Sequence, residues 1–150
     1  MKPFILAVSL LLFVACDSDD DTNNNANAFE NIVTELPQGN WEVSYFYKND
    51  MDDTQSYSAF TFTFNENGTV DAINDILTES GVWSYDGSDD TSDDDGIEND
   101  EELDLQFPQN GLLKDLSEDW HITAVSSSEI VLYDISDGNS SADFLTFRKI

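Results

Sequence analysis

The sequence predicts an all-β domain, an eight-stranded antiparallel up-and-down meander that forms a small barrel, closed or nearly so. Apolar and polar residues alternate along most of residues 37–150, which is the period of a strand with one buried face. Short links rich in Gly, Asn, Asp and Ser separate these segments, and no long helix is expected between them, which argues against a parallel α/β sheet. Eight strands are also the number that closes a small barrel around side chains or one small ligand.

The first elements of this domain can be read in order. Residues 28–36 are expected to form two helical turns, which Pro37 ends. The first strand is expected over residues 40–48, where alternation places on one face Trp41, Val43, Tyr45 and Tyr47. In the next strand, within residues 57–66, the residues expected to share a face are Phe60, Phe62 and Phe64. Asn67-Gly68 then predicts a hairpin turn.

Six further strands complete the predicted meander. They are expected over residues 69–74, 80–87, 102–107, 119–125, 128–135 and 142–150. The link at residues 110–117 is expected to contain a short helical turn. Consecutive strands with short links pair as antiparallel neighbours, so the expected strand order follows the chain.

Composition and charge limit the partners. The chain has 150 residues, enough for one domain with a hydrophobic core, and 39% of them are hydrophobic. Its 32 acidic and 5 basic residues give a formal net charge of −27, which repels nucleic acid and anionic lipid. Cations, basic proteins and neutral ligands are the partners that this charge allows. The single cysteine cannot form an internal disulfide, so packing must hold the fold.

The N-terminal segment indicates where the protein is located. Residues 1–15 have the features of a secretory signal peptide, with Lys2 before an apolar run too short to span a bilayer. The run ends in F-V-A-C, which resembles the bacterial lipobox, although Phe13 stands where leucine is usual. The resemblance implies that Cys16 is lipidated and that acyl chains hold the protein to a membrane without spanning it. An ordinary signal peptide with an incidental cysteine is the alternative.

An acidic segment without an apolar period follows. Residues 16–28 are therefore expected to be the lipidated cysteine and a flexible, solvated tether, before a folded domain at residues 29–150. An acidic run directly after the lipidated cysteine resembles the surface-export signal of lipoproteins in one phylum of Gram-negative bacteria. It implies an outer-membrane lipoprotein exposed at the cell surface. A generic spacer, with the domain facing the periplasm, is the alternative.

Several motifs of the domain resemble the lipocalin-like domains of small bacterial lipoproteins. Gly39-Asn40-Trp41 matches the Gly-x-Trp that opens the first strand of lipocalins, and a second Gly-x-Trp ends at Trp83. The resemblance covers residues 36–150 and implies a barrel that binds a small apolar ligand. It also implies that Arg148, on the last strand, packs over Trp41 as a cation–π contact and closes one barrel end. An inward Arg148 would require its neighbours on that strand to point outward.

The sequence shows no catalytic constellation, so we expect a protein that is not an enzyme. Its one histidine, His121, is expected on the surface or at a strand edge, on the face opposite Trp120. Lipidation would consume the thiol of Cys16, which leaves no cysteine nucleophile. The sequence contains no Gly-rich phosphate loop, no Cys/His metal cluster and no nucleophile elbow.

The acidic loop at residues 86–104 is the one candidate for a metal site. Asp93, Asp95 and Glu102 fall at the third, fifth and twelfth positions of an EF-hand calcium loop. Thr91 stands at the first position, where aspartate is expected, and strands flank the loop where an EF-hand has helices. Calcium is therefore the possible cofactor that the sequence raises, and a solvated acidic loop without an ion is the alternative.

Two functions remain open from the sequence. The first is a binding module for a small apolar ligand, with Trp41 at the closed end and a cavity lined by Val43, Tyr45, Tyr47, Phe60, Phe62, Phe64, Trp83, Tyr85, Leu103 and Leu105. The second is a structural or interaction protein of the cell surface, with a filled core and the acidic loop as its working surface. An open cavity would favour the first function, and a filled interior would favour the second.

Overall fold

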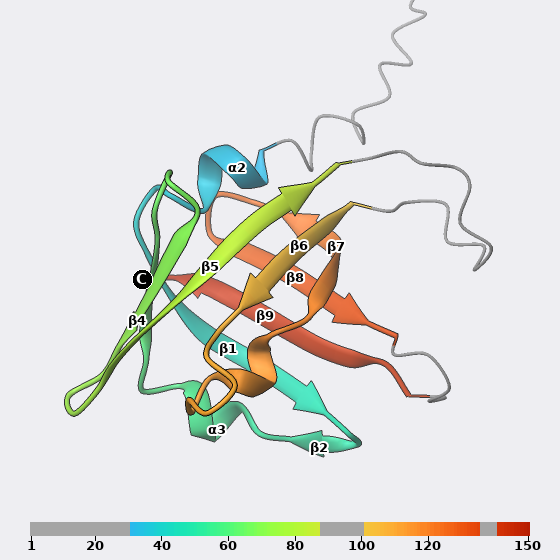
Figure 1. The fold of residues 1–150 in the computed structure, drawn as a ribbon. Helices are drawn as coiled ribbons and strands as arrows, with labels where there is room; N and C mark the ends of the chain where they lie inside the picture. Colours follow the sequence, from blue (N-terminus) through green and yellow to red (C-terminus); the bar gives the residue numbers. More distant parts are fainter. Residues whose placement is uncertain (1–30, 88–100, 136–140) are drawn as a thin grey trace, which may run out of the picture.

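The computed structural model describes residues 31–87, 101–135 and 141–150. Its strands form one antiparallel sheet in the order β2-β1-β3-β4-β5-β6-β7-β8-β9, and an additional β1–β9 pairing closes this sheet into a barrel (Figure 1). The predicted eight-stranded up-and-down meander is confirmed, with the two-residue strand β2 added beside β1.

The helices and strands are short and follow each other along the chain. They are α2 (Ile32–Glu35), β1 (Asn40–Lys48), β2 (Met51–Asp52), α3 (Thr54–Tyr57), β3 (Thr61–Phe64), β4 (Thr69–Ile73), β5 (Thr78–Asp86), β6 (Glu102–Gln106), η1 (Lys114–Leu116), β7 (Asp119–Val125), β8 (Glu129–Asp134) and β9 (Asp143–Lys149). Of the two helical turns predicted over residues 28–36, the second is present as α2, and residues 28–30 lie outside the described residues. The turn predicted within residues 110–117 is present as η1. The second predicted strand begins only at Thr61, because α3 occupies the residues just before it.

The β3–β4 turn confirms the hairpin predicted from Asn67-Gly68. Gly68 has a φ of 81°, a left-handed conformation that favours glycine. The Asn67 side chain accepts a hydrogen bond from the Thr69 amide at 3.1 Å, which closes the turn. The Gly68 carbonyl accepts the Trp83 amide at 2.8 Å, so the turn is also attached to β5.

An irregularity in β1 reverses the predicted facing of its second half. The β1–β9 register shifts between Val43 and Tyr45, as a β-bulge does. After the shift Phe46 is buried, with its ring 4.8 Å from that of Tyr57, whereas Tyr45 is 40% exposed. The prediction that Tyr45 and Tyr47 share the inner face with Val43 is therefore wrong. Both tyrosines lie on the outer face of the barrel, and Phe46 takes their place inside.

Aromatic rings fill the barrel interior. The Phe147 ring lies 5.3 Å from Phe62 and 5.5 Å from Phe64, and Phe64 lies 5.9 Å from Trp83, all nearly perpendicular. Such edge-to-face contacts are favourable beyond the area that they bury. The largest fully buried side chains are Trp41, Trp120, Phe46, Phe62, Phe64, Phe147, Ile32, Leu36, Leu103, Leu105, Leu113 and Leu116. The interior is thus a packed core.

The barrel end beside α2 is closed by a lysine over a tryptophan. Lys149 Nζ lies 5.1 Å from the centre of the Trp41 ring, and Trp41 Nε1 donates to the Leu36 carbonyl at 2.9 Å. The predicted contact of Trp41 with Arg148 is wrong. Arg148 faces outward and donates to Glu42, because the inward-facing positions of β9 fall on the odd-numbered residues that include Lys149.

The opposite end is covered by the link between β6 and β7, which also contains η1 (Figure 1). This link buries three apolar side chains, Phe107, Leu113 and Leu116. The buried carboxylate of Glu79 on β5 holds it in place by accepting the backbone amides of Leu112 at 3.0 Å and Leu113 at 3.3 Å. A carboxylate that accepts two amides is well satisfied even when it is buried.

Candidate functional site

Most residues that were predicted to line a ligand cavity belong to the packed core. Val43, Phe60, Phe62, Phe64, Trp83, Leu103 and Leu105 are buried, and Tyr85 packs against them. Their rings contact one another, so these side chains occupy the space that a ligand would need. Tyr45 and Tyr47 lie outside.

The predicted lipid and calcium sites fall largely outside the described residues. Cys16 lies there, as do Asp93 and Asp95. Glu102 is described and lies on β6. Across the described ranges, no three His, Cys, Asp or Glu side chains are grouped so that they could hold a metal ion. No helix in the part of the chain that the structure describes has the length and apolar character needed to cross a membrane.

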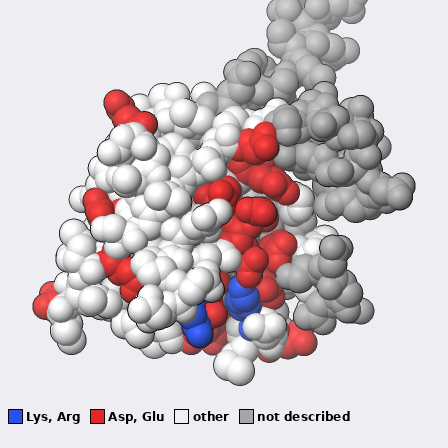
Figure 2. Space-filling view, viewed as in Figure 1, with Lys and Arg blue, Asp and Glu red and all other residues white. Residues whose placement is uncertain are grey.

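The outer side of β5, β6 and β7 carries two pairs of acidic residues, and the two members of each pair lie opposite each other on neighbouring strands. Asp86 lies opposite Glu102, and Asp104 lies opposite Asp119. Their neighbours along the strands point into the core, so these four side chains project outward. We call Asp86, Glu102, Asp104 and Asp119 the acidic ladder. Figure 2 shows carboxylates gathered in a band on this face of the molecule.

One member of the acidic ladder, Asp119, is harder to ionise than an ordinary aspartate. The pKa of Asp119 is raised above its usual value, first by partial burial and then by the negative charge of Asp104. A hydrogen bond between the two side chains adds to the rise, as do the nearby charges of Glu118 and Asp134. A carboxylate that already lies among negative charges is harder to ionise, so this face carries an electrostatic cost.

The basic side chains of the described residues do not offset that cost at Asp104 and Asp119. Their ion pairs go to Glu35, Glu42 and Glu118. Within the described ranges, no lysine or arginine pairs with Asp104 or Asp119. Asp104 instead accepts hydrogen bonds from the neutral side chains of Ser84 at 3.3 Å and Gln106 at 3.2 Å.

A row of rings continues from Glu102 across the outer face. His121, Tyr133, Phe144 and Tyr47 lie directly opposite one another on β7, β8, β9 and β1. The ring centroids of His121 and Tyr133 are 5.1 Å apart, and those of Tyr47 and Phe144 are 6.3 Å apart. We call these four residues the ring row. His121 Nδ1 lies 3.4 Å from Glu102 Oε1, so the ring row and the acidic ladder form one continuous surface.

This surface can attract and hold positively charged groups. Carboxylates attract cations over a distance and pair with them on contact. Ring faces bind lysine and arginine side chains through cation–π attraction and apolar contact. His121 lies on the face opposite Trp120, as predicted, but its side chain is only 13% exposed and not at a strand edge. Phe144 is 39% exposed, so a partner could reach the row at that residue.

Among the members of this surface, sequence reasoning singled out Tyr47, Glu102 and His121, and it missed their juxtaposition with the others. Glu102 and Asp119 belong to different strands, and the register that brings strands together is not visible in one sequence. The available signal was the presence of aromatic residues at outward positions of the strands, such as Tyr133 beside the inward Leu132. Large apolar surfaces in such positions are unusual unless they contact a partner.

No protein-family model and no curated protein matches this chain. Among solved structures, a DUF4847 family protein from Bacteroides vulgatus ATCC 8482 is similar, with a TM-score of 0.48 and 16% sequence identity. The match covers 78% of this chain and 96% of that chain. At this level of similarity it carries no argument, so the class of this protein rests on its own strand pairing. It is a closed antiparallel β-barrel with a filled core and an acidic outer face.

Proposed function

We propose that this protein is a non-enzymatic binding module of the cell surface that takes a positively charged protein partner on the acidic ladder and the ring row. It would be a lipoprotein of the outer membrane, held by acyl chains on Cys16. This is close to the second of the two functions that the sequence left open, with the acidic ladder and the ring row as the working surface in place of the acidic loop. The filled interior supports it over a buried apolar ligand, because aromatic side chains occupy the barrel.

The like-charge pair of Asp104 and Asp119 is the observation that carries this proposal. Like charges directly opposite each other destabilise a sheet, and a neutral residue at either position would remove the repulsion. Residues that are unfavourable for the local structure and do not stabilise the fold are expected at functional sites. A cationic group bound between the two carboxylates would relieve their repulsion. Part of the binding free energy would therefore come from removing the electrostatic repulsion that is present in the unbound protein.

The ring row supports a partner that carries arginine or lysine side chains. A cation over an aromatic ring contributes about 0.5–2 kcal/mol, depending on how far it is desolvated. Tyrosine and other aromatic residues are also enriched in the centres of protein interfaces. Attraction between opposite charges would speed association, so the affinity should fall as the salt concentration rises.

The position of the domain in the cell is part of the proposal. The tether at residues 17–28 reaches at most about 40 Å, which would keep the domain within reach of the membrane surface. A net charge of −27 opposes contact with anionic headgroups, so the domain would stand off the lipid. Cys16→Ser should release the full chain from membranes; retention of the variant in the membrane fraction would contradict the lipid anchor.

A peptide titration tests the binding surface. The probe is nona-arginine, added to the full chain in detergent at near-physiological salt, and the readout is fluorescence anisotropy of the labelled peptide. The double variant Asp104→Asn/Asp119→Asn should bind about tenfold more weakly. The matched control Asp50→Asn/Asp75→Asn removes the same charge from exposed loop positions and should stay within about twofold. An equal loss in both variants would mean that only net charge matters, and the proposed surface would be wrong.

A further inference from the structure

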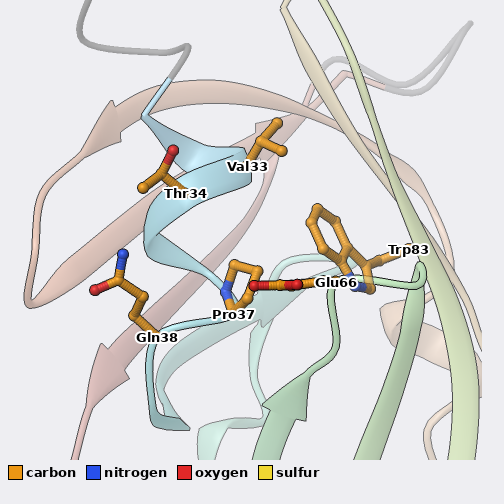
Figure 3. A pocket seen from close by; sticks show the side chains of 6 residues that line it. All are labelled: Val33, Thr34, Pro37, Gln38, Glu66 and Trp83. Carbon is orange, nitrogen blue, oxygen red and sulfur yellow. The ribbon is translucent and has the colours of Figure 1, made fainter.

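A pocket of about 370 Å³ lies outside the barrel core, between α2 and the β3–β4 turn. Figure 3 shows the side chains that line it, which come from three parts of the chain: Val33, Thr34, Pro37, Gln38, Glu66 and Trp83. The volume lies within the usual range for sites that bind small molecules. The pocket does not share a residue with the acidic ladder or the ring row.

The apolar wall of the pocket is rigid. The Trp83 ring packs at 86° against the Phe64 ring of the core, and Trp83 Nε1 donates to the Asn65 carbonyl at 3.0 Å. The indole N–H is therefore satisfied, so the ring contributes carbon surface to the pocket. Pro37 ends α2 and has little conformational freedom of its own. A ligand would find this wall already formed, which lowers the entropic cost of binding.

One charged side chain lines the pocket. Glu66 belongs to the β3–β4 turn and is exposed, whereas Thr34 and Gln38 contribute neutral polar groups. A carboxylate beside an aromatic ring favours a cation, because the ring face and the negative charge both attract it. Anionic ligands would be repelled by Glu66 and by the net charge of −27. The lining therefore favours a ligand that has an apolar body and a positively charged end.

We propose that this pocket binds a small organic cation with an apolar body, whose ammonium group lies beside Glu66 while the body contacts Trp83, Pro37 and Val33. This site is separate from the proposed protein-binding surface and does not depend on it. The protein would then have two binding surfaces, one for a basic partner and one for a small amine.

The test uses the full chain and two probes of similar size and opposite charge, 2-phenylethylamine and 3-phenylpropionate. The readout is the indole N–H resonance of Trp83 in nuclear magnetic resonance spectra, assigned as the signal that Trp83→Phe removes. Trp41 and Trp120 are fully buried and serve as internal references. The amine should shift the Trp83 signal saturably and leave the other two indole signals in place, whereas the carboxylate should shift none of them.

Variants separate the pocket from general charge effects. Glu66→Gln keeps the shape of the side chain and should weaken amine binding about fivefold, the scale of an exposed ion pair. Asp75→Asn removes one exposed charge elsewhere and should leave the affinity unchanged. Asp104→Asn/Asp119→Asn should also leave it unchanged, so a failure of the proposed protein-binding surface would not affect this result. The proposal is overturned if the amine leaves the Trp83 signal in place, if both probes shift it equally, or if Glu66→Gln and Asp75→Asn weaken binding alike.

Discussion

Asp104 and Asp119 lie directly opposite each other on β6 and β7, close enough for their carboxyl groups to share a hydrogen bond when Asp119 is protonated. The pKa of Asp119 is raised by partial burial, then by the charge of Asp104 and by that hydrogen bond. Each cause favours the protonated form of Asp119 in the folded state. The pair therefore links the stability of the sheet to pH, and it does so on the surface that we propose for binding.

The first prediction concerns the pH dependence of stability. The pKa of Asp119 is higher in the folded than in the unfolded chain. The free energy of unfolding therefore falls as the pH rises from the unfolded-state pKa to the folded-state pKa. Asp119→Asn should remove this loss and raise the free energy of unfolding at neutral pH by at most about 1 kcal/mol, since solvent screens the repulsion. Urea titrations at several pH values measure it. The advantage of the variant should vanish in acid; an advantage that persists there would contradict the electrostatic cause.

The second prediction compares two neighbouring cations of β9. Lys149→Met removes the charge over the Trp41 ring and the ion pair with Glu35, and it should cost about 1 kcal/mol of stability. Arg148→Met removes a side chain that is largely exposed and should cost less than about 0.5 kcal/mol. Denaturant titration of both variants gives the comparison. If Arg148→Met cost more than Lys149→Met, the assignment of the closing cation to Lys149 would be wrong.

The third prediction tests whether the core is filled. Phe147→Ala removes a fully buried ring that contacts Phe62 and Phe64, and it should cost about 3–5 kcal/mol. Phe144→Ala changes the same residue type on the outer face of the same strand and should cost less than about 1 kcal/mol. Benzene should raise the melting midpoint of Phe147→Ala, because it can enter the new cavity. A comparable rise in the unsubstituted protein would contradict a filled interior.

The fourth prediction concerns the buried carboxylate at the β6–β7 link. Glu79→Leu leaves the amides of Leu112 and Leu113 without their acceptor and should cost about 2–4 kcal/mol. Glu79→Gln keeps one acceptor oxygen and should cost less. Gly111→Ala should also destabilise, because its Cβ would clash with the carboxylate of Glu79. Thermal unfolding of the three variants measures this order, and equal stability of Glu79→Leu and the unsubstituted protein would contradict it.

The fifth prediction concerns calcium. If Asp93, Asp95 and Glu102 bind the ion, millimolar calcium should raise the melting midpoint of the full chain, and chelator should reverse the rise. The triple variant Asp93→Asn/Asp95→Asn/Glu102→Gln should lose this effect. A midpoint that does not respond to calcium would leave the loop as a solvated spacer. A rise that persists in the triple variant would place the ion elsewhere.

The sequence predicted the strands and their order well, because alternation and turn residues report local burial. The strands from residue 69 onward, the Asn67-Gly68 turn and the helical turn before Pro37 all lie close to where they were expected. Alternation gave the wrong inward-facing residues in the second half of β1, because one bulge inverts the facing of every later residue of that strand. Such an insertion leaves no mark in the composition of a strand, so Tyr45 and Phe46 could not be told apart from the sequence.

The candidate site was harder to predict than the fold. Asp104 and Asp119 come together because β6 and β7 pair in one particular register, and the intervening link gives no sign of that register. The cation that packs over Trp41 was also predicted wrongly. The resemblance to lipocalins implied Arg148, whereas the alternation of side chains along β9 turns Lys149 toward the Trp41 ring. The order of the strands was predicted correctly, whereas contacts that depend on the register between two strands were not.

The pairing of β1 with β9 has a consequence for the order in which the protein can fold. The Ile150 amide, directly after β9, donates to the Asn40 carbonyl at 2.9 Å, so the end of β9 is fixed against the start of the first strand. The barrel cannot close until β9 has been synthesised, and contacts between such distant residues form slowly. A chain that is proposed to leave the cytoplasm through its signal peptide would therefore have an open sheet while its earlier strands are being made. Late closure would keep those strands competent for export.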